Sequence, residues 1–146
     1  MENKTPRPLL KRIRAFLLTV ITIGSAAVGA NAQTIPWVAP NDAANAHNPL
    51  TASPTVLADA RTIYVANCGP CHGDKGRGDG PAAQALTPKP ADHSSALVQN
   101  ESDGSLFWKL SEGRNPMPSY KKVFTDQQRW ELILYIRTLS KTAKKK

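Results

Sequence analysis

The chain has 146 residues, with 19 Lys and Arg against 11 Asp and Glu, which gives a formal net charge of +8. Residues 1–32 hold five of the basic residues and one of the acidic ones, leaving 14 and 10, or +4, for the remainder; three of those charges are Lys144, Lys145 and Lys146. Because the excess positive charge lies at the two ends of the chain and not on one folded face, no nucleic-acid partner is expected.

The first 32 residues have the three parts of a secretory signal. A basic stretch over residues 1–14 precedes an apolar run over residues 15–28, and Ala30-Asn31-Ala32 has small residues at the two positions that a signal peptidase reads. The apolar run is shorter than the roughly 20 residues of a membrane-spanning helix. We therefore predict a Sec-type signal peptide over residues 1–32, cleaved before Gln33, and export to the periplasm. The alternative is an uncleaved segment that anchors the protein to the membrane, facing the periplasm.

Residues 33–53 are predicted to form a disordered linker, because they are rich in Ala, Asn and Pro and show no periodic apolar face. Trp37 and His47 lie in this linker and are expected to be exposed. A folded domain is predicted over residues 54–140, followed by a basic tail over residues 141–146. A domain of this length commonly needs a disulfide, a metal or a cofactor to complete its core.

The first predicted helix covers residues 55–66. Ser53-Pro54 is a helix start signal, with a capping side chain followed by a proline at the first turn. Apolar residues then recur every three or four positions, at Val56, Ala60, Ile63 and Tyr64. This stripe is expected to face the core and to place Cys68 at the end of the helix.

The pentapeptide Cys68-Gly69-Pro70-Cys71-His72 contains both cysteines of the chain. A Cys-x-x-Cys pair followed at once by His is the attachment signature of a c-type haem: the two thiols reach the two vinyl groups of one porphyrin, and the imidazole can bind the iron. Three other readings stay open at this point. They are a thioredoxin-like redox pair, which needs a βαβ unit; a zinc site, which needs more ligands; and a plain disulfide.

Two polar stretches follow the pentapeptide. Residues 73–81 are dense in glycine and charge, but they lack the strand and the Lys-Ser/Thr pair of a phosphate-binding loop, so a tight turn is predicted, with a short helical turn over residues 81–86. Asp92-His93-Ser94 places an acid, an imidazole and a hydroxyl in sequence. Local hydrogen bonding is favoured over catalysis there, since neighbours in sequence do not face one another as a triad requires. His93 is also considered as an alternative haem ligand.

A second helix is predicted to begin at Ser102 and to end at Gly113, with Leu106, Phe107 and Leu110 on its buried side. Met117 follows, between Pro116 and Pro118. The two prolines favour an extended loop, which would pin the thioether sulfur as a soft ligand for iron. The alternative is a methionine that fills a gap in the core.

The last helix is predicted from Asp126 to about Leu139. Thr125 is the expected cap and Gln128 stands at the capping-box position. A broad apolar face made by residues 130–139 is expected to pack against the first helix.

Taken together, these motifs resemble the class I c-type cytochromes over about residues 55–140. The features that carry the resemblance are Cys68-x-x-Cys71-His72-Gly73, the Gly-Asp-Gly-Pro loop, Met117-Pro118-Ser119-Tyr120 and Tyr135-Ile136-Arg137. The resemblance implies an all-α fold of three to five helices around one covalently attached haem c. It implies that Cys68 and Cys71 hold the haem, that His72 is the proximal iron ligand and that Met117 is the distal one. It also implies a proline carbonyl that orients the proximal imidazole, for which Pro81 is the candidate.

The function implied by this resemblance is electron transfer, with no catalytic residue. We predict a periplasmic one-electron carrier, not an enzyme, whose partners are membrane or periplasmic oxidoreductases. Two alternatives stay open. One is an electron-transfer subunit of a membrane-bound respiratory or dehydrogenase complex, and the other is a haem enzyme or sensor with a displaceable sixth ligand.

Overall fold

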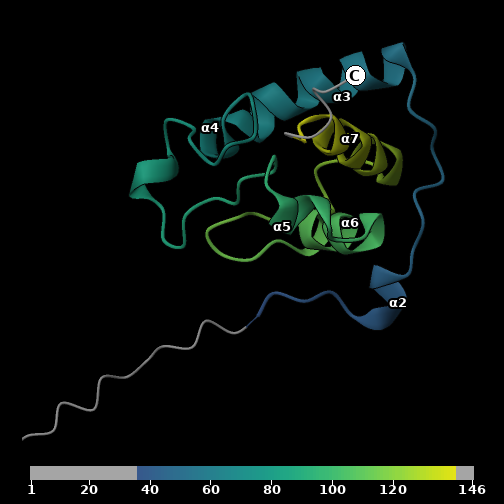
Figure 1. The fold of residues 1–146 in the computed structure, drawn as a ribbon, viewed down its shortest axis with the longest axis horizontal. Coiled ribbons are helices and arrows are strands. Elements are labelled where there is room, and N and C mark those ends of the chain that lie inside the picture. Colours follow the sequence, from purple (N-terminus) through teal and green to yellow (C-terminus); the bar gives the residue numbers. More distant parts are fainter. Residues whose placement is uncertain (1–35, 141–146) are drawn as a thin grey trace, which may run out of the picture. The chain divides into compact units, whose positions relative to one another are not determined.

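The computed structural model describes residues 36–140, and the regular secondary structure of that range is helical, as the sequence predicts. Six α-helices and one 3-10 turn occur there, without any strand in the same range (Figure 1). The elements, in chain order, are α2 (Asn41–Ala44), α3 (Pro54–Asn67), α4 (Gly69–His72), η1 (Ala83–Ala85), α5 (Ala96–Gln99), α6 (Asp103–Glu112) and α7 (Asp126–Thr138). The predicted signal peptide and the predicted basic tail lie outside the described residues.

The three long helices, α3, α6 and α7, begin at the caps that the sequence predicts. The hydroxyl of Ser53 accepts a hydrogen bond from the backbone N–H of Val56 at 3.2 Å, and that of Ser102 accepts one from Ser105 at 3.1 Å. Thr125 and Gln128 form the full capping box. These local hydrogen bonds satisfy donors that the first turn of a helix leaves open, so the helix starts follow from short sequence motifs.

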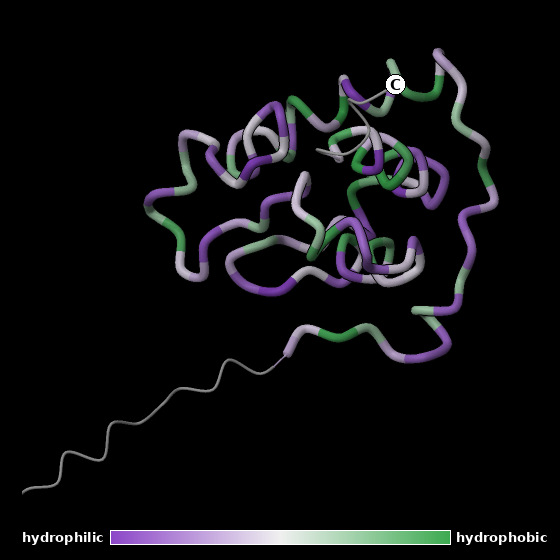
Figure 2. The backbone as a smooth tube through the Cα atoms, viewed as in Figure 1, coloured by the Kyte–Doolittle hydropathy of each residue, from purple (hydrophilic) through white to green (hydrophobic). Residues whose placement is uncertain are grey.

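The core lies where α3 packs along α7, with α6 against α7. Tyr64 of α3 and Leu132 and Ile133 of α7 are fully buried, and α6 adds Leu106 and Leu110. Figure 2 shows hydrophobic segments within these three helices, whereas most of the connecting loops are hydrophilic. The predicted inward stripe of the first helix is confirmed for Ala60 and Tyr64, which have no exposed surface.

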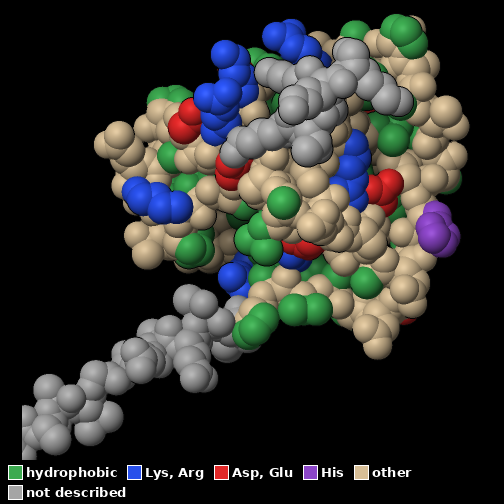
Figure 3. Space-filling model, in the orientation of Figure 1, with side chains coloured by type: hydrophobic (Ala, Val, Ile, Leu, Met, Phe, Trp, Pro, Cys, Tyr) green, Lys and Arg blue, Asp and Glu red, His purple; other side chains and the backbone are tan. Residues whose placement is uncertain are grey.

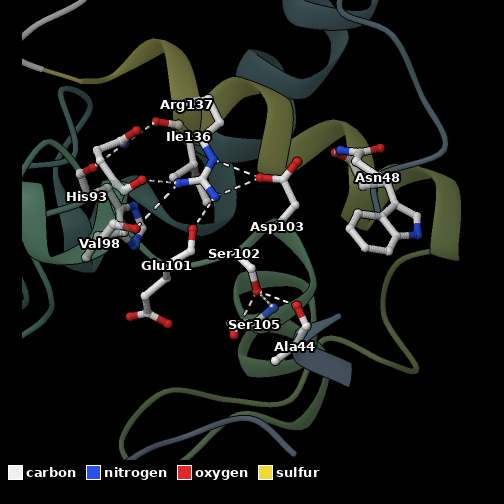
Figure 4. A network of polar contacts seen from close by, with 12 residues as sticks. Ala44, Asn48, His93, Val98, Glu101, Ser102, Asp103, Ser105, Ile136 and Arg137 are labelled. Carbon is white, nitrogen blue, oxygen red and sulfur yellow. Dashed lines mark hydrogen bonds and ion pairs between the residues drawn. The ribbon is translucent and has the colours of Figure 1, made fainter. Parts of the chain in front are cut away.

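Arg137 of α7 fastens the junction between α5 and α6 (Figure 4). Its Nε donates to Oδ1 of Asp103 at 2.8 Å, and its terminal nitrogens donate to the backbone carbonyls of Gln99 at 2.9 Å and Glu101 at 2.5 Å. The planar guanidinium can satisfy several acceptors at once, which a lysine ammonium does less specifically. This one side chain therefore orders the segment that follows residue 98.

Residues 36–53 differ from the disordered linker that the composition predicts. Helix α2 packs against α6, where the hydroxyl of Ser102 donates to the carbonyl oxygen of Ala44 at 2.6 Å (Figure 4). The side-chain amide of Asn48 donates to the carbonyl oxygen of Trp130 at 3.0 Å, and Ala39 is buried. These partners lie 58 and 82 residues away in sequence, so tertiary contacts order a segment that lacks a periodic pattern of its own. We call residues 36–53 the N-terminal strap.

Charge on the described part of the molecule is mixed in sign. On the face shown in Figure 3, Lys and Arg side chains are interspersed with Asp and Glu side chains. Within residues 36–140, no helix has the length and apolar character that crossing a membrane would need.

We predict that Gly104→Ala releases the N-terminal strap from α6. A Cβ atom at Gly104 would lie 2.1 Å from the carbonyl oxygen of Ala43 and 2.7 Å from that of Ala46, and backbone atoms cannot move aside as a flexible side chain could. Overpacking of this kind costs about 1–3 kcal/mol, which exceeds the gain of up to about 1 kcal/mol from replacing a helical glycine by alanine. Hydrogen exchange measured by mass spectrometry should show faster exchange of the amides of Ala44 and Asn45.

Glu112→Ala, at an exposed position of the same helix, is the matched control and should leave that exchange unchanged. Slow exchange at residues 44 and 45 in Gly104→Ala would contradict the packing described for the strap.

Candidate functional site

A single cavity of about 310 Å³ gathers most of the residues that the sequence analysis singled out. Cys68, Cys71, His72, His93 and Met117 all line it. Much of the remaining wall is apolar and comes from α5, α6, α7 and the loops: Leu86, Pro88, Pro90, Val98, Leu106, Leu110, Pro116, Pro118, Leu132 and Ile136. The volume is at the lower end of the range of about 300–1,000 Å³ that is typical of small-molecule and cofactor sites.

The pentapeptide forms one helical turn directly after α3. The amide of Cys71 donates to the carbonyl oxygen of Cys68 at 3.1 Å, and that of His72 donates to the same oxygen at 2.8 Å. Side chains three and four positions apart lie on one face of a helix. The two thiols and the imidazole therefore face the same side, toward the cavity that all three line.

The glycine-rich loop after His72 folds back onto this turn, as the tight turn predicted there requires. The amide of Gly78 donates to the carbonyl oxygen of His72 at 2.8 Å, and that of Gly80 donates to the carbonyl oxygen of Cys71 at 3.1 Å. A Cβ atom at Gly80 would lie 2.4 Å from the carbonyl oxygen of Pro70, so only glycine permits this approach. The loop thus satisfies carbonyl groups that would otherwise be left open at the end of α4.

The imidazole of His72 is buried and has one ring nitrogen engaged. Its Nδ1 lies 2.9 Å from the carbonyl oxygen of Ala91, which can only accept, so Nδ1 carries the proton and donates. Burial lowers the pKa of His72, an effect that the Ala91 bond opposes in part. The ring is therefore neutral near pH 7, with an unprotonated Nε2 that can bind a metal.

Ala91, and not Pro81, orients this imidazole, which corrects the prediction made for Pro81. Pro81 is exposed and its carbonyl oxygen is not the partner of His72 Nδ1. The error lies in the loop length: the chain makes the additional turns of residues 81–90 before it returns to His72. The sequence contains a proline near the correct place, at Pro90, but the accepting carbonyl belongs to the next residue.

Both cysteines are free thiols in the structure. Burial raises the pKa of Cys68 to about 12, with a further contribution from the neighbouring Cys71. Cys68 is therefore a protonated thiol at neutral pH, which is a weak nucleophile. The thioredoxin-like interpretation needs a βαβ unit around the pair, and residues 36–140 form helices without a strand.

Met117 lies in a tight turn and not in the extended loop predicted for it. Its amide donates to the carbonyl oxygen of Arg114 at 2.8 Å, and its carbonyl oxygen accepts from the amide of Arg114 at 2.9 Å. Tyr120 fastens the same loop elsewhere, because its hydroxyl donates to the carbonyl oxygen of Asn67 at 3.1 Å, next to Cys68. The position of Met117 is thus tied to the end of α3, from which the pentapeptide starts.

The N-terminal strap adds an aromatic ring to the cavity wall. Trp37 is half-buried and lines the cavity, in contrast to the exposure predicted for it. The guanidinium of Arg114 lies 5.1 Å from the centre of its ring and the ammonium of Lys109 lies 5.6 Å from it. Lys109 also pairs with Glu101 at 2.5 Å. His47, the other residue of this segment that was expected to be exposed, is exposed and does not line the cavity.

Comparison with known proteins matches residues 55–136 to the family described as cytochrome C oxidase, cbb3-type, subunit III. The matched segment is more than half of the chain and includes the pentapeptide and Met117. The chain belongs to this family. It is a class I c-type cytochrome, and its described residues form the small all-α cytochrome c fold. Haem binding and a role in electron transfer follow from this membership at the level of the family.

One solved structure is similar at the level of both fold and sequence. It is described as the Kuenenia stuttgartiensis reducing HAO-like protein complex Kustc0457/Kustc0458, with a TM-score of 0.57 and 31% sequence identity. The match covers 64% of this chain and 47% of the other, so this chain spans about half the length of the chain in that structure. The comparison with curated proteins gives no match.

The residues around the cavity fit a haem. A porphyrin needs apolar walls for its ring, and the leucines, prolines and Ile136 supply them. It needs an axial ligand with an available lone pair, which Nε2 of His72 offers, and the hydrogen bond to Ala91 fixes the required tautomer. Positive charge for the two carboxylate groups of the cofactor would come from Lys89 and Arg114 on the wall, since Lys109 is already paired with Glu101.

We predict that the protein without haem does not fold cooperatively. The site of about 310 Å³ is bordered by core side chains of the long helices, and without the haem its apolar walls have no apolar partner. Because the free energy of unfolding of a small domain is only about 5–15 kcal/mol, losing this buried apolar surface removes a large part of the stability. Protein produced under haem limitation should show a broad thermal transition by circular dichroism, in contrast to a sharp transition for the haem-loaded protein. A sharp transition within a few degrees of the loaded form would contradict the prediction.

Proposed function

We propose that this protein is an exported one-electron carrier that binds one haem c covalently, with His72 and Met117 as axial ligands. The observation that carries the proposal is that one cavity is lined by both thiols, by the imidazole and by the thioether. No other methionine lies in the described residues. A bound haem supplies the iron that alternates between the ferrous and ferric states.

Each proposed residue has a distinct role. The thiols of Cys68 and Cys71 would add across the two vinyl groups of the porphyrin, with each sulfur forming a thioether bond and each thiol proton passing to the neighbouring vinyl carbon. His72 would bind through Nε2, and its Nδ1–H bond to Ala91 makes the ring a stronger donor. Met117 would complete the coordination with a soft, neutral sulfur, which raises the reduction potential relative to harder ligands. With both axial positions taken, the protein is suited to pass electrons and not to activate a substrate.

The proposed location is the periplasm, and the proposed partners are membrane or periplasmic oxidoreductases. The basic and apolar pattern of residues 1–32 supports export. The partner class is supported by the description of the family as an oxidase subunit and by the description of the similar structure as part of a complex. These same descriptions favour a second candidate, in which the chain is a subunit of a respiratory complex and not a free shuttle.

Intact mass spectrometry of denatured protein, purified from the exported fraction, tests attachment, stoichiometry and processing together. We expect the mass of residues 33–146 plus one haem, because thioether bonds survive denaturation whereas iron–ligand bonds do not. The variant Cys68→Ala/Cys71→Ala should lose the haem mass on denaturation. A haem-free mass for the native sequence would refute covalent attachment, and retention of residues 1–32 would favour the membrane-anchored alternative.

Met117→Ala tests the distal ligand and separates the carrier from an enzyme or sensor. We expect the ferric protein to lose the weak red absorption band of thioether ligation and to bind cyanide rapidly. Its reduction potential should fall by on the order of 0.1 V, within the roughly 0.8 V over which axial ligands tune haem potentials.

Val123→Ala, at an exposed position in the following loop, is the control and should behave as the native protein. If the native protein already binds cyanide rapidly and Met117→Ala changes nothing, the sixth position is open and the enzyme or sensor alternative is correct.

A further inference from the structure

The backbone of His93 is held by hydrogen bonds, although it lies in a loop. Its amide donates to the carbonyl oxygen of Gly76 at 2.6 Å, and its carbonyl oxygen accepts from the side-chain amide of Gln99 at 2.6 Å. The same amide nitrogen of Gln99 also donates to the carbonyl oxygen of Ile136 at 2.9 Å, which ties the segment to α7 (Figure 4). Both the amide and the carbonyl group of His93 are thus held, independently of the contacts that its ring makes.

The imidazole of His93 has its own hydrogen-bond partner in the core. Its Nδ1 lies 2.9 Å from the hydroxyl of Tyr64, whose side chain is fully buried. Burial raises the pKa of Tyr64 far above its ordinary value, so the phenol stays protonated at neutral pH and its hydroxyl forms a hydrogen bond with Nδ1 of His93. This hydrogen bond gives the His93 ring a defined orientation.

The other contact of this ring is with the proposed proximal ligand. The rings of His93 and His72 are stacked, with centroids 4.0 Å apart and planes 19° from parallel. The sequence Asp92-His93-Ser94 does not act as a triad, because Asp92 accepts from Ser94, at 2.8 Å from its amide and 2.5 Å from its hydroxyl, while His93 bonds to Tyr64. His93 therefore meets the ligand through the face of its ring and not through a hydrogen bond.

Two constraints on His72 then complement each other. The hydrogen bond from Nδ1 to Ala91 lies in the plane of the ring and fixes where that edge points, but a single bond leaves the ring able to turn about it. A parallel ring at van der Waals distance blocks that rotation, because turning would drive His72 into His93. Together the two contacts define both the position and the plane of the imidazole.

We propose that His93, oriented by the Tyr64 hydroxyl, is a positioning residue that sets the plane of the His72 imidazole on the haem iron. This inference rests on the proposed function, in that it takes His72 as the proximal ligand. The plane of an axial imidazole controls how its π orbitals overlap with those of the iron, so it affects the electronic structure of the ferric state and the reduction potential. A leucine at residue 93 would fill the same space but could not be oriented by Tyr64.

The test compares three variants of the haem-loaded protein. His93→Ala removes the stacked ring, and His93→Phe keeps a ring that cannot form a hydrogen bond with Tyr64. Tyr64→Phe keeps both rings and removes the orienting hydroxyl. Tyr135→Phe is the matched control: Tyr135 is also buried against Tyr64, and within residues 36–140 the ring contacts of the two histidines do not include it. The readouts are the low-temperature electron paramagnetic resonance g values of the ferric form and the reduction potential.

We expect His93→Ala to shift and broaden the g values and to change the reduction potential. Tyr64→Phe should broaden the g values with a smaller shift, and His93→Phe should give a shift between those of His93→Ala and Tyr64→Phe. Tyr135→Phe should match the native protein. Native g values and potential in both His93→Ala and Tyr64→Phe would overturn the proposal. If His93→Ala yields no loaded protein, Tyr64→Phe decides the outcome alone. A native protein without a low-spin ferric signal would instead refute the proposed axial ligation, which keeps the two failures distinct.

Discussion

The single helical turn that follows α3 is the constraint on which the site depends. Because Cys68, Cys71 and His72 stand at the first, fourth and fifth positions of that turn, the helix geometry alone places two thiols and an imidazole on one face. The turn can form there only because α3 ends at Cys68 and the glycine loop then folds back on its carbonyl groups. Packing of α3 on α7 fixes the direction in which that face points.

The same packing leaves the core open on one side, and this open side forms the cavity. Helices α3, α6 and α7 bury Tyr64, Leu132 and Ile133 completely, yet Leu106, Leu110 and Ile136 still border the cavity. A domain of this size gains little stability from a core alone, so a large apolar cofactor can supply what the side chains do not. The N-terminal strap also contributes to the cavity wall, through Trp37. Trp37 lies outside the segment that matches the family.

The sequence predicts those features that depend on local chemistry and misses those that depend on distant contacts. The caps at Ser53, Ser102 and Thr125 are short motifs with a direct physical effect, so the three long helices follow from them within a residue or two. The strap has no comparable motif, because its order comes from Asn48 and from the close approach of Ala43 to Gly104. The prediction of Pro81 as the partner of His72 is wrong for a similar reason, because the path of the loop over residues 81–90 decides which carbonyl group reaches the ring.

The two proposed iron ligands are held by different means, and the difference suits a one-electron carrier. His72 sits in regular structure, with its ring fixed by Ala91 at one edge and by His93 across one face. Met117 sits in a loop, but its backbone is closed by paired hydrogen bonds with Arg114, and Tyr120 ties the loop to the end of α3. A small change in geometry between oxidation states requires that neither ligand move when the charge changes. A rigid imidazole alone would not keep the geometry constant, because a mobile Met117 sulfur could change its position when the iron changes oxidation state. For the proposed His72 and Met117 ligation, the hydrogen bonds that fasten the Met117 loop to the end of α3 therefore matter as much as those around His72.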